Sequence, residues 1–145
     1  WTVRPCGSLD TEGYQIPPLE PDAGGGHVMH IYLDGAWYEI SRPIADPTNL
    51  IGSLDVSVLQ KDILEGMLGI SDPRADTRLH YMGGAKPLRE LERLVDDGRY
   101  ALAVAMQPVP IETVLAIADA GGVMPPKSTW FEPKLLSGLV VHTID

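Results

Sequence analysis

Two kinds of residue are scarce in this chain, and each shortage excludes a class of protein. Among 145 residues there is a single cysteine, Cys6, so no disulfide can form within the chain and a disulfide-stapled scaffold is excluded. No histidine motif accompanies Cys6, so we do not expect it to act as a nucleophile. Basic residues are also few, because 11 Lys and Arg face 20 Asp and Glu for a net charge of −9. Such a field repels nucleic acids and anionic membranes, so neither is an expected partner.

Long apolar runs are missing as well. No run approaches the ~20 residues that a membrane-spanning helix needs, and no charged, then apolar leader opens the chain. We therefore expect a soluble, cytoplasmic protein with no membrane partner. A chain of this length is expected to form one domain that buries about 70% of its unfolded surface. Because it begins at Trp1 rather than Met, we interpret it as a fragment of a longer protein.

The composition divides the chain near residue 26. Residues 5–26 are rich in Gly, Pro, Asp and Glu, a mixture that buries too little apolar surface to offset the cost of ordering. We therefore predict a flexible segment or linker at residues 1–26 and a single domain at residues 27–145. The run Gly24-Gly25-Gly26 is not followed by a helix pattern, so it indicates a hinge rather than a phosphate-binding loop.

Hydrophobic periodicity predicts an α+β fold. Residues 28–33 and 36–40 flank Asp34-Gly35, which readily adopts the positive φ angles of a type I′ turn, so a β-hairpin is expected. Ser53 or Asp55 is the expected cap of the next helix. The remaining patterns predict helices at 56–67, 86–97 and 111–120 and strands at 78–82, 100–106 and 138–144. The order β-β-α-β-α-β-α-loop-β is that of a mixed sheet with about three helices packed on it.

Several stretches carry a resemblance to a known family. They are Gly83-Gly84-Ala85, residues 34–38, 54–59 and 88–96, and the long stretch 118–139. From about residue 27 to its end, the chain resembles the C-terminal part of the prokaryotic family called domain of unknown function 1015. Complete members resemble the ParB and sulfiredoxin-like superfamily, which includes free-serine kinases.

The resemblance has implications for cofactor and partner. In the related kinases an Asp-Gly-His-His-Arg type of motif belongs to the nucleotide site, and this chain has no such motif. The resemblance therefore implies that a nucleotide would be the cofactor of the whole protein, and that this part, alone, is inactive. It also implies an N-terminal half of the same protein as the partner of this domain.

One candidate anion site follows from the pattern. Gly83-Gly84 is expected between a strand and a helix N-terminus, where free backbone N–H groups and the helix dipole favour an anion. An ordinary tight turn is the alternative interpretation. Further along, a proline-rich loop offers two ammonium groups and two hydroxyls that can reach the same anion: Lys127, Ser128, Thr129 and Lys134.

The same loop holds two aromatic residues, Trp130 and Phe131. Prolines on both sides fix the backbone, so these rings are candidates for docking against the N-terminal half or a second subunit. The alternative is that both rings fill the core, since buried aromatics supply much apolar area.

The histidines and acidic clusters give no metal site. His27 and His30 are three residues apart on a predicted strand, so their side chains point to opposite faces and cannot share an ion. His80 and His142 lie in strand patterns and are expected to be hydrogen-bonded sheet residues. The acidic clusters, Asp72 with Asp76 and Asp96 with Asp97, lack the residue order of a calcium loop and are expected to be solvated. Ser128 and Ser137 have no identifiable base, so acyl transfer has no support.

Two hypotheses from different classes remain. The first is a non-catalytic interaction or regulatory domain of a larger cytoplasmic protein, with a homodimer as one form of the interaction. The second, which the resemblance implies, is the ligand-binding part of a nucleotide-dependent kinase whose phosphates lie at Gly83-Gly84 and Lys127-Ser128-Thr129. We favour the first for this chain, because no complete set of catalytic residues can be assembled from its sequence.

Overall fold

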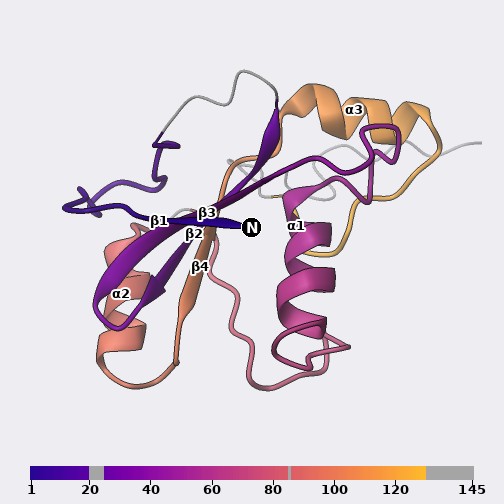
Figure 1. Ribbon diagram of the computed structural model, residues 1–145. Helices are drawn as coiled ribbons and strands as arrows, with labels where there is room; N and C mark the ends of the chain where they lie inside the picture. The colour runs from indigo at the N-terminus through magenta and orange to yellow at the C-terminus, as the bar shows by residue number, and fades with distance from the viewer. Residues whose placement is uncertain (20–24, 85, 130–145) are drawn as a thin grey trace, which may run out of the picture.

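The computed structural model describes residues 1–19, 25–84 and 86–129 (Figure 1). It confirms the α+β fold class. The elements, in chain order, are β1 (Thr2–Pro5), β2 (Gly26–Leu33), β3 (Ala36–Pro43), α1 (Asp55–Val58), the π-helical stretch η1 (Leu59–Glu65), α2 (Arg89–Asp96), β4 (Ala103–Met106) and α3 (Ile111–Asp119).

The hairpin of β2 and β3 is the centre of the fold. Its turn residues have left-handed backbones, with φ of 50° at Asp34 and 77° at Gly35, as the type I′ prediction requires. The turn sets Leu33 opposite Ala36, and the ladder continues to His27 opposite Arg42. The predicted hairpin is therefore confirmed, with strands longer than the sequence pattern indicated.

The sheet is antiparallel throughout its described strands, in the order β1-β3-β2-β4, and not mixed as expected. The predicted strand at residues 78–82 is not formed. There the carboxylate of Asp76 accepts hydrogen bonds from the backbone N–H and the guanidinium of Arg78, and these bonds hold the chain in a turn. The predicted strand at 100–106 is shortened to β4, and the one at 138–144 lies outside the described residues.

The sheet separates two apolar cores, because successive side chains of a strand point to opposite faces. On one face, Met29 and Ile40 pack against Val58 and Ile63 of the α1–η1 helix. On the other face, Tyr32 and Trp37 pack with Ile16 and with Leu88, the residue before α2. Figure 1 shows α1 and α2 on opposite sides of the strands.

The N-terminal segment differs from the predicted linker over its described part. Residues 2–5 form β1, which pairs with β3, and the side chain of Ile16 is only 3% exposed. The backbone carbonyls of Thr11 and Gly13 accept hydrogen bonds from the N–H groups of Arg89 and Leu88. This polar segment is ordered although it has few apolar residues, because it pairs with the edge of the sheet and its carbonyls accept hydrogen bonds from the start of α2. Of the predicted hinge, Gly26 opens β2, while Gly24 lies outside the described residues.

The helices follow the sequence pattern with shifted ends. The predicted helix at 56–67 begins at Asp55 and continues as η1. Neither expected cap operates, because Ser53 Oγ donates to the carbonyl of Asn49 at 2.8 Å and Asp55 binds a histidine. α2 begins at Arg89 instead of residue 86. α3 agrees with its prediction to one residue, although Ile117 is its only buried side chain.

Candidate functional site

The predicted anion site at Gly83-Gly84 lacks the free helix N-terminus on which the hypothesis depended. Residues 66–82, which lead into the turn, form no strand, and α2 begins only at Arg89. The N–H groups of Leu88 and Arg89 are already bound, at 2.9 and 3.0 Å, to the carbonyls of the N-terminal segment. The first turn of α2 also carries Glu90 and Glu92, which repel an anion.

The proline-rich loop does approach this turn. The ammonium nitrogen of Lys127 lies 4.0 Å from the ring centroid of Tyr81, two residues before Gly83. Ser128 Oγ donates to the carbonyl of Pro125 at 2.6 Å, so this hydroxyl is engaged within its own loop, whereas Thr129 is exposed. Three predicted site residues lie outside the described residues: Trp130, Phe131 and Lys134.

The histidines have distinct environments. His27 and His30 are both buried on β2, and their places in the ladder put them on opposite faces of the sheet. His80 is exposed and stacks on the ring of Tyr100 instead of joining a strand, and His142 lies outside the described residues. Across residues 1–19, 25–84 and 86–129, no three His, Cys, Asp or Glu side chains gather as a metal-binding group.

A buried polar row crosses the sheet at His30. Glu39 stands opposite His30 in the ladder, with 3.6 Å between Oε2 of Glu39 and Nε2 of His30. Burial lowers the pKa of His30, because the charged imidazolium loses its hydration there. Burial alone would raise the pKa of Glu39, but hydrogen bonds from the N–H of Leu19 and from Arg4, each 2.6 Å, lower it. Glu39 thus holds the N-terminal segment to the sheet as an ionised carboxylate.

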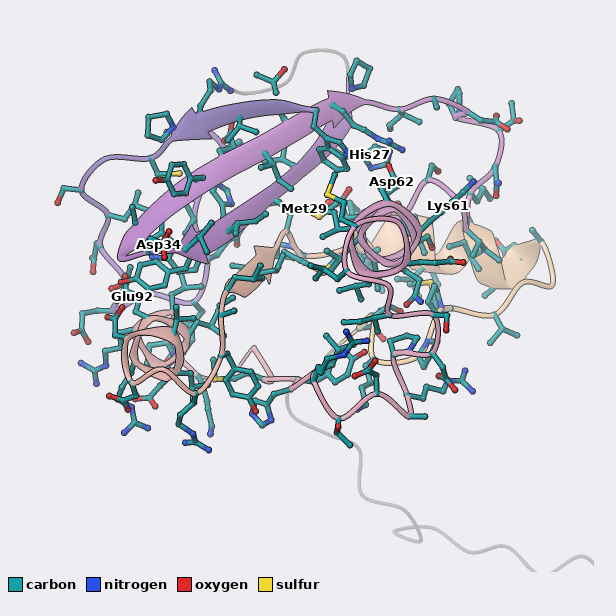
Figure 2. The ribbon with its side chains drawn as sticks, turned by 60° about the horizontal axis from the view of Figure 1, so that its bottom comes forward. His27, Met29, Asp34, Lys61, Asp62 and Glu92 are labelled. Atoms are coloured by element: carbon teal, nitrogen blue, oxygen red, sulfur yellow. The ribbon has the colours of Figure 1, made fainter. Side chains whose placement is uncertain are left out.

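A small polar cavity of about 170 Å³ lies on the opposite face of the sheet. It is bounded by the start of β2, the end of β3, the loop at residues 45–52 and the α1–η1 helix. Its polar walls come mainly from His27, Arg42, Asn49, Ser57, Lys61 and Asp62. Figure 2 shows the labelled side chains of His27, Asp62 and Lys61 around this helix, next to the sheet.

The local fold explains why these side chains meet. The hairpin register places His27 beside Arg42 on the same face of neighbouring strands. The first residue of α1, Asp55, reaches Nδ1 of His27 with Oδ1 at 2.8 Å, and Asp62 of η1 pairs with the guanidinium of Arg42. Burial raises the pKa of Asp55, although its hydrogen bond with His27 opposes this effect.

Sequence reasoning missed this group of residues. It treated Asp55 as a cap and considered His27 only as one member of a metal pair. One available signal was the two-residue turn, which, continued back along both strands, pairs His27 with Arg42.

A second notable feature is an apolar surface on α3. Its ridge consists of Ile111 and Leu115, one turn apart, with exposed fractions of 50% and 57%, and it is followed by Val123 at 81%. We call these three residues the α3 surface. After the helix, the chain packs closely at Gly122, where an added Cβ would lie 3.0 Å from Cγ2 of Ile117 and 3.1 Å from Cδ1 of Ile51. Figure 1 shows α3 apart from the two helices that cover the sheet.

No family model matches the chain, and neither a curated protein nor a solved structure matches it. The resemblance to the domain of unknown function 1015, and through it to the free-serine kinases, therefore stays a prediction. Within the described part of the chain, every helix is too short or too polar to cross a membrane.

Proposed function

We propose that this chain is a non-catalytic interaction domain of a larger cytoplasmic protein, and that the α3 surface is its contact region. The observation that supports the proposal is a mostly apolar helix that buries one side chain, Ile117, and leaves Ile111 and Leu115 half exposed or more. A monomer gains little from such a helix, because tertiary packing of an apolar face supplies most helix stability.

The chemistry of α3 suits contact with protein rather than with a charged ligand. The helix has no Lys or Arg, and its two acidic residues, Glu112 and Asp119, stand near its ends. Full burial of one Leu or Ile side chain contributes about 1.5–3 kcal/mol, so even this small ridge is a useful anchor.

The partner that we propose is a second copy of the chain. In this dimer a two-fold axis sets the ridge of Ile111 and Leu115 against the same ridge of the other copy. Because the two residues are four apart, the ridge can pack into the groove of the facing helix. An interface built on so few side chains belongs to the weak, transient class. Because each copy carries a net charge of −9, added salt screens their repulsion and should strengthen the association.

Sedimentation velocity over a range of concentrations tests this proposal. We expect the parent chain to form dimers at high concentration and Leu115→Glu to stay monomeric, since a buried carboxylate opposes the contact. The matched control is Met67→Glu, because Met67 is 69% exposed and lies outside the α3 surface. A monomeric parent at every concentration, or unchanged dimerisation of Leu115→Glu, would contradict the proposal.

Two predictions from the sequence extend this proposal. Trp130 and Phe131 follow the α3 surface in the chain and would enlarge the contact. The N-terminal half that the resemblance implies would be a further partner, and any nucleotide-dependent kinase activity would belong to the whole protein.

A further inference from the structure

We infer that the cavity beside His27 binds a small oxyanion, a phosphate or carboxylate group, which is held mainly by Lys61 and Arg42. This inference is independent of the α3 surface. It concerns a ligand site between the hairpin and the α1–η1 helix.

Lys61 is the charge that this cavity leaves without a partner. The two carboxylates that line the cavity are both engaged, Asp62 with Arg42 and Asp46 with the N–H and hydroxyl of Thr48. Asp55, which does not line the cavity, binds His27. Lys61 lines the same cavity and makes no ion pair with any residue in the described ranges. An incoming anion would give Lys61 the partner that it lacks.

Arg42 has hydrogen-bonding capacity to spare. A guanidinium carries five N–H donors, and Arg42 uses Nη1 for Asp62. Its flat group also lies over the ring of Trp1, with 5.0 Å between the guanidinium carbon and the ring centroid. This stacking and the ion pair fix the orientation of the group, so its remaining donors are held in place before a ligand arrives.

His27 adds a ring nitrogen to the wall of the cavity. Its ring is 2% exposed, lines the cavity and is held through Nδ1 by Asp55. With a proton on Nδ1, the neutral ring has Nε2 as an acceptor; protonation turns both nitrogens into donors.

The size of the cavity limits the ligand. Sites for drug-sized molecules enclose about 300–1,000 Å³. A cavity of about 170 Å³ is too small for a nucleotide but accommodates a phosphate or carboxylate group.

The helix geometry at the site points the same way. Lys61 and Asp62 belong to η1, a π-helical stretch of seven residues, Leu59–Glu65. π-helical turns are rare and are found frequently at functional sites, where they redirect side chains. Here the stretch supplies both an unpaired ammonium group and the anchor of Arg42.

Nuclear magnetic resonance titrations with inorganic phosphate, acetate and glycerol phosphate test the inference on the intact chain. We expect saturable shifts of the His27 ring and of the Lys61 and Asp62 amides. Lys61→Gln should weaken binding about ten-fold, the loss of a charged hydrogen bond. Lys86→Gln is the matched control, since Lys86 is exposed and does not line the cavity.

The outcomes separate the ligand sources. Binding of phosphate and glycerol phosphate supports a phosphate group carried on a larger molecule, phosphate alone supports the free ion, and acetate alone supports a carboxylate. A folded chain whose His27 signals move with none of the three anions would overturn the inference. Equal affinity of Lys61→Gln and the parent chain would do the same.

Discussion

The imidazole of His27 and the carboxylate of Asp55 are joined by a hydrogen bond of 2.8 Å between Nδ1 and Oδ1. It connects the first turn of α1 to the start of β2, 28 residues earlier in the chain. The contact both attaches the helix to the sheet and fixes which nitrogen of His27 carries a proton in the neutral ring. Stability and the proposed anion site thus depend on the same pair.

Removal of Asp55 should destabilise the protein. In Asp55→Ala, the buried Nδ1 of His27 loses its partner, and an unsatisfied buried donor costs about 1–3 kcal/mol. Urea unfolding should show this decrease in the free energy of unfolding. Asp97→Ala is the control, because Asp97 is exposed at the end of α2. Equal stabilities of both variants would show that the His27 contact contributes nothing.

The hairpin turn depends on glycine at one position. Gly35 has φ of 77°, so Gly35→Ala forces a Cβ into the left-handed region at a cost of about 1–2 kcal/mol. Gly84→Ala should have little effect, since Gly84 has no positive φ and a Cβ there would meet nothing within 4 Å. Thermal unfolding compares the two. The turn assignment fails if Gly84→Ala is the more damaging change.

Acidification should weaken the fold through His30. Burial holds the pKa of His30 below its usual 6.5, so below pH 6.5 the unfolded chain binds a proton that the folded chain resists. Stability from this residue is complete above pH 6.5 and falls as the pH drops toward the lowered folded value. Urea midpoints at descending pH should therefore decrease, and His30→Gln should flatten that decrease. His80→Gln, at an exposed histidine, should leave the profile unchanged, and a profile equally steep in His30→Gln would contradict the assignment.

The N-terminal segment should contribute to stability although its composition resembles that of a linker. Ile16→Ala removes a side chain that is 3% exposed and should cost about 2–5 kcal/mol. Leu19→Ala, at a side chain that is 41% exposed, should cost less. Equilibrium unfolding in urea measures both, and equal small losses would mean that the segment does not pack in solution.

The hairpin shows how far sequence reasoning reaches. Asp34-Gly35 fixes the turn, the turn sets Leu33 opposite Ala36, and every further pair follows by counting along the strands. The same count pairs His27 with Arg42 on one face and His30 with Glu39 on the other. Both of these polar pairs could therefore be predicted from the sequence. The contacts of Asp55, Lys61 and Asp62 could not, because these residues belong to a helix whose packing against the sheet does not follow from counting along the strands.

One failure of the prediction originates in a local contact, and two originate in nonlocal contacts. Residues 78–82 resemble a strand by composition, yet the carboxylate of Asp76 binds Arg78 and makes a turn. Residues 6–19 look like a linker, yet Glu39 and the backbone around Leu88 bind them from far along the chain. Gly83-Gly84 was expected at a helix N-terminus, whose N–H groups the same N-terminal segment occupies. In these last two cases the local pattern does not contain the partners.

The most direct test of the central claim, interaction through the α3 surface, is a series of amide spectra of the intact chain from micromolar to millimolar concentration. We expect shifts that grow with concentration and with salt and that concentrate at residues 111–123. Shifts confined to other parts of the chain, or none at any concentration, would contradict the claim.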